Sequence, residues 1–448
     1  MYSKETLRTV QSCLEEVATE KLRQCLQDLH PVDIAEVMPG INLAQRVKVL
    51  KVMDSDRAAM VIMELDRDLV PPLLEGLGRH RTAEILAEMF TDDAADLLGE
   101  MPGDKKELLL GLMQAADAKD VKELLEYGEE TAGGIMTTEY VAIRQGITVE
   151  QAIQVLRKTA PDAETVYYVY VVNAENQLVG VISLRELIIA GPTTLIEDIM
   201  RTNFITVHVR TDQEEVAKLV AKYDFLAIPV VNDDRELLGI VTVDDVLDVI
   251  QEEATEDILR MTANIDGEAR DLDAGPLRRA MLRLPWLLVL MCGSLLAGNV
   301  IEGFLGVLEQ LAVLAIFITV LAGGPGNVAT QSMAVVVRGL ATGEVNSLSI
   351  LSVVWKEVRV GFLLGAVCGL ALAIIGFAWQ GSPLLGLVVG LTLAINMVMA
   401  TMLGSLFPLV INRLGIDPAL ASGPFITTVM DVTSMLIYFT LATIILLR

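Results

Sequence analysis

The pattern of hydrophobic and polar positions divides the chain into two parts. Before residue 279, apolar positions recur in short runs with the spacing of helices and strands. After it, five long apolar stretches follow one another, each about the 20 residues that a helix needs to cross a bilayer. They cover residues 286–301 (extending to about 308), 311–337, 360–379, 384–411 and 420–447. The sequence therefore predicts a soluble N-terminal part and a transmembrane domain of five helices over residues 279–448.

Residues 1–128 carry short helical patterns that are interrupted by Pro and Gly, such as VDIAEVMPG and RTAEILAEMF. We expect this segment to form an acidic, all-α N-terminal superhelical domain. Several of the helices begin near aspartates, where a carboxylate caps free N–H groups and suits the helix dipole. Capping is the simplest interpretation of Asp33, Asp56, Asp92 and Asp93.

An internal repeat follows the helical segment. One copy contains IMTTEYVAI, VEQAIQVL and YVYVVNAENQLVGVISLREL, and the other contains IMRTNFITV, QEEVAKLVAKYD and LAIPVVNDDRELLGIVTVDDVLDV. Each copy predicts a short strand, a helix, two strands around an Asn-containing turn and a second helix. The repeat resembles a tandem pair of CBS domains, which implies an α/β pair with repeat 1 over residues 129–190 and repeat 2 over 191–254.

Pairs of CBS domains often bind adenosine nucleotides in the cleft between their repeats, so the resemblance makes ATP a possible ligand. By the same resemblance, Tyr168, Arg185, Glu186 and Phe225 are candidates for contacts with the base and the ribose. The alternative is a pair that binds no nucleotide and only dimerises and relays a signal.

The charge of the chain is unevenly distributed. The chain has a net charge of −25, with 59 acidic and 34 basic residues. From residue 279 onward there are six acidic and seven basic residues, so the first 278 residues carry a net charge of −26. Such acidity argues against nucleic acid and anionic lipid as partners and favours cations. The four cysteines form no CxxC pair, and the N-terminus has no apolar signal segment.

The connections between the apolar stretches predict the topology. Basic residues lie before the first stretch (Arg278, Arg279, Arg283), between the second and third (Arg338, Lys356, Arg359) and between the fourth and fifth (Arg413). The other two connections contain no Lys or Arg. Because basic connections stay in the cytoplasm, the N-terminal domains should be cytoplasmic and the C-terminus outside. Five spans also argue against two equal inverted repeats.

Asp431 is the only charged residue between Pro418 and Leu447. A charge that deep in a membrane-length segment is costly, so it usually faces a bundle interior and marks an ion path. The alternative is an ion pair with a basic residue in another span. The apolar stretches between Arg359 and Arg413 contain no Lys, Arg or His, which favours the ion path.

An acidic stretch, VDDVLDVIQEEATEDILRM, joins the repeat to the membrane domain. Its carboxylates recur at helical spacing, and like charges there destabilise an isolated helix. A bound cation would remove that cost, and Mg²⁺ prefers carboxylate oxygens and water. An ordinary solvated acidic helix is the alternative. We expect a connecting (plug) helix over residues 255–278.

With these segments assembled, the chain resembles an MgtE-type magnesium channel over essentially its whole length. The membrane motifs carry most of the resemblance: RRAMLRLPWLL, AGGPGNVATQSMAVVVRGLATGEV and DPALASGPFITTVMDVTSMLIYF. The second motif departs from the usual pattern, because Pro325 and Ala329 stand where glycines are common. Asn327 and Gln331 are kept.

The resemblance implies two sets of sites. Asp431 falls where the family has its pore magnesium ligand. Mg²⁺ loses its bound water reluctantly and prefers six oxygen ligands in an octahedral arrangement. A two-fold homodimer, the commonest assembly, would supply this aspartate twice. Further candidates for the pore are Asn327, Gln331, Thr427 and Asp417. The alternative for Asp417 is a helix N-cap. The regulatory Mg²⁺ ligands that the resemblance implies are Asp92, Asp96, Glu214, Asp224, Asp245, Asp248, Glu253, Glu256 and Asp257.

The sequence thus predicts a homodimeric Mg²⁺ channel of the inner membrane that cytosolic Mg²⁺ closes. An ion-coupled transporter of divalent cations on the same scaffold is one alternative. A nucleotide-sensing signalling protein with a membrane anchor is another. We expect no enzyme, because the chain has three histidines without metal-ligand spacing and no P-loop or nucleophile elbow.

Overall fold

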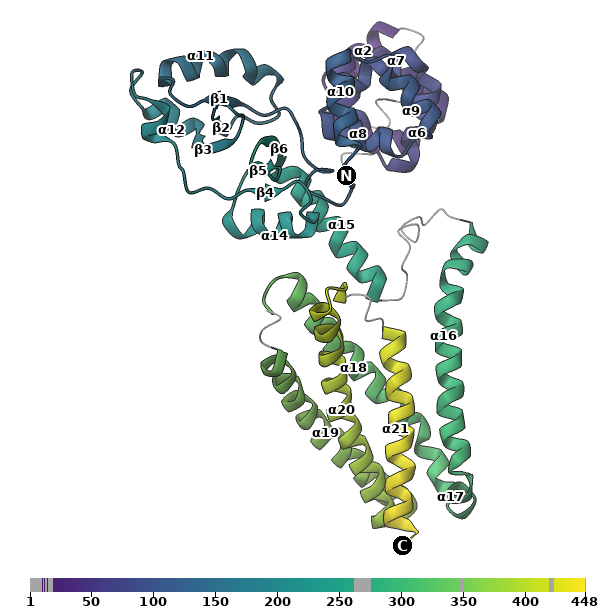
Figure 1. The fold of residues 1–448 in the computed structure, drawn as a ribbon. Coiled ribbons are helices and arrows are strands. Elements are labelled where there is room, and N and C mark those ends of the chain that lie inside the picture. The colour runs from purple at the N-terminus through teal and green to yellow at the C-terminus, as the bar shows by residue number, and fades with distance from the viewer. Residues whose placement is uncertain are drawn as a thin grey trace. The chain divides into compact units, whose positions relative to one another are not determined.

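The structure is a computed structural model of the 448-residue chain. It describes residues 10, 12, 14, 19–261, 275–345, 350–418 and 423–447. The chain forms two compact units, Met1–Ile250 and Gln251–Arg448 (Figure 1). Much of the predicted connecting helix, residues 262–274, lies outside the described residues.

The N-terminal domain is a stack of short helices. They are α2 (Thr19–Gln27), α3 (Pro31–Val37), η1 (Met38–Gly40), α4 (Leu43–Val52), α5 (Ser55–Met63), η2 (Arg67–Leu69), α6 (Val70–Leu77), α7 (Arg79–Leu86), α8 (Thr91–Gly99), α9 (Gly103–Leu110) and α10 (Ala115–Leu124). Packing skips one helix at a time: α2 contacts α4, α3 contacts α5, α4 contacts α6, and α8 contacts α10. This arrangement confirms the all-α superhelical prediction.

The expectation that aspartates cap these helices is wrong in its detail. Asp33, Asp56, Asp92 and Asp93 do lie in the first turns of α3, α5 and α8. The residues before α5 and α8 make no side-chain cap bond, and His30 caps α3. The aspartates of these first turns therefore suit the helix dipole without occupying the N-cap position. Asp92, which is buried, does accept from the backbone N–H of Asp93 at 3.0 Å.

Each half of the repeat contains a three-stranded sheet. Repeat 1 contains β1 (Ala142–Arg144), α11 (Val149–Thr159), η3 (Ala160–Asp162), β2 (Tyr168–Val172), β3 (Leu178–Ser183) and α12 (Leu184–Ile189). Repeat 2 contains α13 (Ile196–Ile199), β4 (Val207–His208), α14 (Gln213–Tyr223), β5 (Ala227–Val231), β6 (Leu237–Thr242) and α15 (Val243–Met261). In both sheets the first strand is parallel and the third antiparallel to the middle strand. The α/β pair is confirmed.

The two repeats are matched through their Asn-containing turns. Asn173 Oδ1 accepts from the backbone N–H of Gln177, and Asn232 Oδ1 accepts from that of Glu236 in the same way. Gln177 and Glu236 form a bridge between the two turns. A second matched pair of bridges joins Thr137 to Ile240 and Arg201 to Val181. Equivalent residues of the two copies therefore sit in equivalent surroundings.

Among its described residues, the second unit contains five helices that are long and apolar enough to span a membrane, which confirms the predicted number. The elements are α16 (Pro276–Gly303), α17 (Leu305–Gln310), η5 (Ala312–Phe317), α18 (Ile318–Ala341), α19 (Ile350–Gln380), α20 (Pro383–Arg413) and α21 (Gly423–Leu446). The first helix ends at Gly303, and the chain continues as α17 after a break at Phe304.

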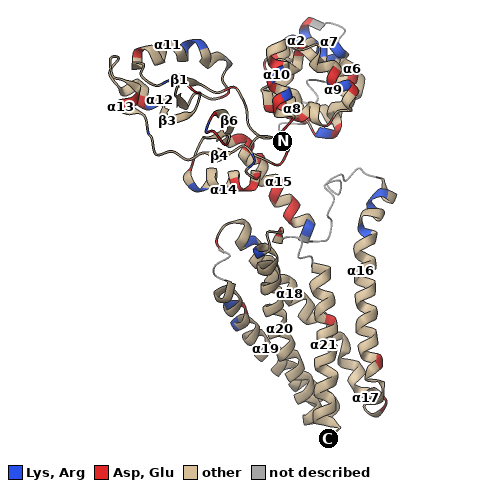
Figure 2. Cartoon of the chain, in the orientation of Figure 1, with Lys and Arg blue, Asp and Glu red and all other residues tan. Residues whose placement is uncertain are grey.

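The basic residues assigned to connections lie mostly on the helices themselves. Arg338 is in the last turn of α18, Lys356 and Arg359 are in α19, and Arg413 is the last residue of α20. The helices therefore extend beyond their apolar stretches. Figure 2 shows how little charge the long helices carry along their middle parts.

Helices α19 and α20 pack in close contact along a seam of glycines. A Cβ atom added to Gly369 would lie 2.6 Å from the carbonyl oxygen of Gly390, and one added to Gly390 would lie 2.5 Å from that of Gly369. Small residues at such seams let helix backbones approach each other in membranes. Helices α18 and α21 pack on α20 through two apolar clusters, one around Phe439 and the other around Met430.

Candidate functional site

Asp431 lies in the middle of α21, one turn after Thr427. Its side chain is half-buried. The neighbouring turn is fixed against α18, because a Cβ atom on Gly326 would lie 3.3 Å from Thr427 Cγ2. The hydroxyl of Thr427 donates to the carbonyl of Pro424 at 3.0 Å. The structure thus brings Thr427 beside the motif on α18 and holds Asp431 one turn further along the same helix.

Two amide side chains of α18, those of Asn327 and Gln331, lie on a different face from its packed residues. Asn327 and Gln331 are four residues apart and exposed, as is Gly323 one turn before them, whereas Gly326 and Ala329 are buried. Side chains at this spacing share one face of a helix. In a membrane-length helix, an exposed polar face needs a partner or water.

Pro325 does not end the helix, since α18 continues through it. Proline has no N–H to donate, so the carbonyl of Leu321 loses its helical hydrogen bond. The departure from the glycine pattern leaves the helix continuous and removes one backbone donor from it.

Asp417, on the loop after α20, is joined to the connecting helix. Its carboxylate accepts from the guanidinium of Arg260 on α15, and Arg260 also pairs with Glu256 one turn earlier. Burial disfavours the charged guanidinium, but Asp417 and Glu256 outweigh it and raise the pKa of Arg260. Glu253 also contributes to this shift. Glu253 and Glu256, two of the predicted regulatory residues, therefore interact with the positive charge of Arg260.

The N-terminal domain contacts the CBS pair through the start of α8. The backbone N–H and the hydroxyl of Thr91 both donate to Glu139, at 3.4 and 2.8 Å. The Thr91 hydroxyl also lies 3.0 Å from that of Thr138. Glu139 accepts a further bond from Thr137 at 2.6 Å. These contacts hold the two aspartates that follow Thr91 against the CBS pair.

A cluster of five carboxylates results, which we call the acidic cluster. It consists of Asp92 and Asp93 from α8, Glu164 from the segment before β2, and Asp244 and Asp245 from the start of α15. One oxygen from each of the last three lies within 4.8 Å of the others, which is close enough to hold a metal ion. Asp92 is only 7% exposed.

Burial and mutual repulsion make the acidic cluster hold protons. Burial raises the pKa of Asp93 to about 7, of Glu164 to about 8 and of Asp245 to about 6. Asp245 adds to the shifts of the other two. Burial, with Asp93 and Asp245, raises the pKa of Asp92 well above its usual range. Buried like charges are relieved by a cation or a proton, so the site is suited to a hard divalent ion.

Of the predicted regulatory residues, only Asp92 and Asp245 belong to the acidic cluster. Asp96, on the exposed side of α8, lies 4.0 Å from Arg67. Glu214 pairs at 2.7 Å with Lys218 on α14, and Asp224 ends that helix in a left-handed conformation. Asp248, Glu253, Glu256 and Asp257 lie further along α15. Sequence reasoning missed Asp93 as a ligand candidate, and it missed Glu164 and Asp244.

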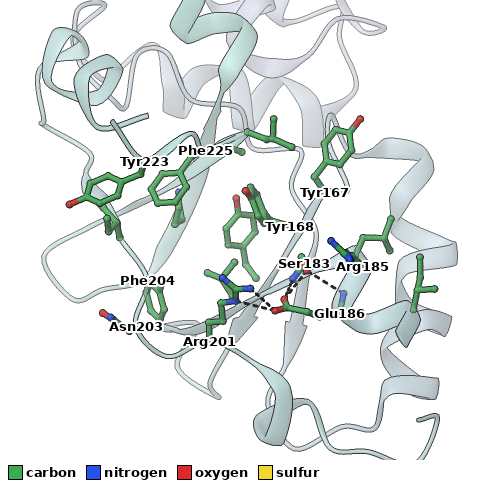
Figure 3. A pocket seen from close by; sticks show the side chains of 18 of the residues that line it. Tyr167, Tyr168, Ser183, Arg185, Glu186, Arg201, Asn203, Phe204, Tyr223 and Phe225 are labelled. Carbon is green, nitrogen blue, oxygen red and sulfur yellow. Dashed lines mark hydrogen bonds and ion pairs between the residues drawn. The ribbon is translucent and has the colours of Figure 1, made fainter. Parts of the chain in front are cut away.

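The four residues predicted to contact a nucleotide do share a cavity, of about 1210 Å³, between the repeats (Figure 3). Tyr168, Arg185 and Glu186 come from repeat 1 and Phe225 from repeat 2. Phe225 stacks on Tyr223 with ring centroids 5.5 Å apart. Arg201 also lines the cavity, and it was not predicted; its guanidinium donates to Glu186 at 2.8 and 3.0 Å.

Five membrane-length helices, an acidic helical domain and a CBS pair define a multi-pass membrane protein for cations with regulatory domains. Comparison with known proteins agrees. Residues 318–441 match the MgtE model, described as a divalent cation transporter, residues 29–130 match the MgtE intracellular N domain, and residues 132–192 and 196–252 match CBS domains.

The curated relatives that are named magnesium transporter MgtE include two from Enterococcus faecalis and Bacillus subtilis. The protein of Enterococcus faecalis is 46% identical over 326 residues, which are 73% of this chain and 71% of the relative. That of Bacillus subtilis is 43% identical over 331 residues, 74% and 73% of the two chains. The chain belongs to the MgtE family of magnesium transporters. Its members are membrane transporters, which confirms that the chain is not an enzyme.

A solved structure resembles the soluble part. It is described as the cytosolic domain of the Mg²⁺ channel MgtE in complex with ATP. It is 42% identical, covers 54% of this chain and 99% of its own, and has a TM-score of 0.53. The N-terminal domains of this chain are therefore the cytosolic domains of an MgtE-family protein.

Proposed function

We propose that the protein is a Mg²⁺-selective channel of the inner membrane, which cytosolic Mg²⁺ closes. The observation that carries the proposal is Asp431: an acidic side chain in the middle of a membrane-length helix, one turn from the contact of Thr427 with Gly326. Membership of a magnesium transporter family gives the ion, and the intramembrane carboxylate gives its ligand.

The pore chemistry follows from the ion. Mg²⁺ sheds its waters reluctantly, so rapid passage requires ligands that hold the hydrated ion through its waters. One carboxylate is a poor site for a divalent ion, and a homodimer doubles it on the symmetry axis. The exposed amides of Asn327 and Gln331 supply the polar lining, with Thr427 at the neighbouring turn. The polar face of α18 then meets its copy and water instead of lipid.

The cytoplasmic mouth of the pore has Asp417 as its candidate ligand. Its pairing with Arg260 supports a state in which the connecting helix is attached to this loop. A guanidinium at this position competes with Mg²⁺ for Asp417. In this proposal α15 blocks the pore electrostatically, because the guanidinium of Arg260 takes the place of Mg²⁺ at Asp417.

Closure by Mg²⁺ is carried by the acidic cluster in the soluble unit and by the carboxylates along α15. An ion among Asp92, Glu164 and Asp245 joins the N-terminal domain to the CBS pair, because the three come from different segments. Asp96, Glu214, Asp224, Asp248, Glu253, Glu256 and Asp257 complete the proposed sensor. Without the ion, their repulsion separates the domains. This is a two-state element that ligand binding biases.

The CBS cavity binds an adenosine nucleotide in this proposal. The relative of the soluble part holds ATP, and the side chains here fit such a ligand. Tyr168 and Phe225 offer aromatic faces to a base, Glu186 accepts from ribose hydroxyls, and Arg185 is exposed in the cavity. A CBS pair that only relays a signal remains the alternative.

The proposed topology has the N-terminal domains in the cytoplasm and the C-terminus outside. Five spans put the two ends of the membrane domain on opposite sides. The basic ends of α18, α19 and α20 support this orientation by the positive-inside rule.

The main alternative is an ion-coupled transporter of divalent cations. Coupling usually requires several ionisable groups at membrane depth, and α21 carries Asp431 alone. A nucleotide-sensing protein with a passive anchor has no need of five spans. We expect a purified, reconstituted protein to carry a current that reverses at the Mg²⁺ equilibrium potential. A reversal potential that follows the H⁺ or Na⁺ gradient would favour the coupled transporter.

Mg²⁺ should protect the segment 245–257 of the full-length protein from protease. In the closed state its carboxylates share ions with neighbouring domains, which lowers local unfolding. Limited proteolysis in detergent, with the cut sites read by mass spectrometry, measures this. Ca²⁺ at equal ionic strength is the control for simple charge screening, and equal cleavage with and without Mg²⁺ contradicts the sensor.

A further inference from the structure

The CBS pair contains two equivalent positions for a ligand, related by the internal repeat. At one, Glu186 follows Ser183 at the start of α12; at the other, Asp245 follows Thr242 at the start of α15. Each carboxylate accepts from the hydroxyl three residues before it. The two positions therefore start from the same local geometry, and differences in their ligands must come from the residues opposite.

The residues that face Glu186 and those that face Asp245 differ in charge. Arg201 and Thr137 are equivalent, since they occupy the same place in IMRTNF and IMTTEY and form the matched bridges to Val181 and Ile240. Arg201 donates to Glu186, and Asn203 and Tyr223 line the same cavity. The equivalents around Asp245 are Thr137, Glu139 and Glu164. One position has become the acidic cluster, and the other has gained a cation and an aromatic ring.

Arg201 forms hydrogen bonds with the carboxylate of Glu186, to which the ribose hydroxyls of a nucleotide would donate. Its Nε and Nη2 atoms donate to Glu186 Oε1 at 3.0 and 2.8 Å, while Oε2 accepts from the backbone N–H and hydroxyl of Ser183 at 2.9 and 2.7 Å. Figure 3 shows the two side chains pointing toward each other across the cavity wall. Both oxygens of Glu186 are thus engaged before any ligand arrives.

The backbone of Arg201 is fixed while its side chain is accessible. The main chain exchanges two hydrogen bonds with Val181, at 2.9 and 3.0 Å. The side chain is 71% exposed, so it can leave Glu186 without disturbing the sheet. A guanidinium released beside the cavity needs an anion, and phosphate is the group that it binds best.

We propose that Arg201 determines the specificity of this cavity, by making it select phosphorylated adenosine nucleotides over adenosine. The ribose hydroxyls displace the guanidinium from Glu186, and the guanidinium then binds a phosphate of the same ligand. A nucleoside also breaks the contact between Arg201 and Glu186, but it has no phosphate with which the guanidinium could form a new one. This proposal rests on the proposed function, in which the cavity binds adenosine nucleotides.

The test is binding of ATP, AMP and adenosine to the full-length protein in detergent, by calorimetry at constant free Mg²⁺. We compare the wild type with Arg201→Thr, which introduces the residue of the equivalent position, and with Arg201→Lys. Arg201→Thr should weaken ATP and AMP by about tenfold, the size of one charge-assisted contact. Its affinity for adenosine should stay equal or increase, because Glu186 becomes available. Arg201→Lys should keep part of the preference.

Arg210→Ala is the matched control, since Arg210 is an exposed arginine of the same repeat that does not line the cavity. Unchanged ATP affinity in Arg201→Thr overturns the proposal, as does an equal loss for all three ligands, which would indicate a structural role. If the wild type binds none of the three, the nucleotide function of the cavity fails as well. If every variant binds ATP as tightly as the wild type, the nucleotide function of the cavity is supported and only the proposed specificity role of Arg201 is overturned.

Discussion

Replacing Asp431 with alanine or asparagine should abolish Mg²⁺ uptake. In the proposed dimer the substitution removes both pore carboxylates at once, and a divalent ion in a low-dielectric channel loses its counter-charge. We expect uptake to fall more than about tenfold, which is the factor that 1.4 kcal/mol produces. Growth of a strain without other magnesium uptake, and Mg²⁺ influx into vesicles, measure the effect.

Asparagine keeps the size of the side chain, so a loss of function in Asp431→Asn is attributable to charge. Glu309→Gln is the matched control, because Glu309 is an exposed carboxylate on α17. It should retain wild-type uptake. Asp431→Glu should keep part of the activity. Full rescue of growth by both Asp431→Ala and Asp431→Asn would rule out the pore assignment.

Neutralising the acidic cluster should make the channel insensitive to cytosolic Mg²⁺. In the double variant Glu164→Gln, Asp245→Asn, two of the three carboxylates that lie within 4.8 Å of one another are lost. We expect the Mg²⁺ concentration for closure to rise by about tenfold or more, because each lost charged contact costs about 1.5–3 kcal/mol. Glu88→Gln with Glu175→Gln removes the same charge from exposed positions and should change little.

The raised pKa values give this site a defined pH dependence. The pKa values of Asp93, Glu164 and Asp245 are raised to about 7, 8 and 6, from ordinary values of 3.8 to 4.5. The folded protein therefore holds more protons than the unfolded chain between these limits. Without metal, the free energy of unfolding should fall as the pH rises from about 4 to about 8.

Mg²⁺ must displace these protons, so its affinity should increase between pH 6 and pH 8. At 100 times the Kd, Mg²⁺ raises the free energy of unfolding by about 2.7 kcal/mol. Thermal unfolding of the full-length protein, with and without Mg²⁺ at both pH values, measures the effect. The double variant should lose most of the pH dependence. An equally steep dependence in the variant would place the protons elsewhere.

Local patterns were sufficient to predict much of this fold. The five spans follow from apolar length alone, and the paired turns follow from Asn173 and Asn232, whose side chains organise the chain within five residues. The four predicted cavity residues follow from the CBS resemblance, because the repeat fixes their positions on strands and helices.

Contacts between distant segments could not be predicted in this way. Arg260 and Asp417 are 157 residues apart, and no local spacing connects them. Glu164 lies outside any regular strand or helix, and it joins the acidic cluster through its interactions with Thr242 and Asp245, which lie far from it in the sequence. Arg201 carried a signal that could have been used: it is the arginine that replaces Thr137 between otherwise similar motifs.

The glycine seam between α19 and α20 has a consequence for how the membrane domain is assembled. Between helices in lipid there is little hydrophobic driving force, so association depends on close backbone packing. The seam provides that packing within a hairpin whose two helices are consecutive in the chain, before α21 has been synthesised. We expect the hairpin to enter the bilayer as a preformed pair. The helix with Asp431 then arrives last, at a surface already built to receive it.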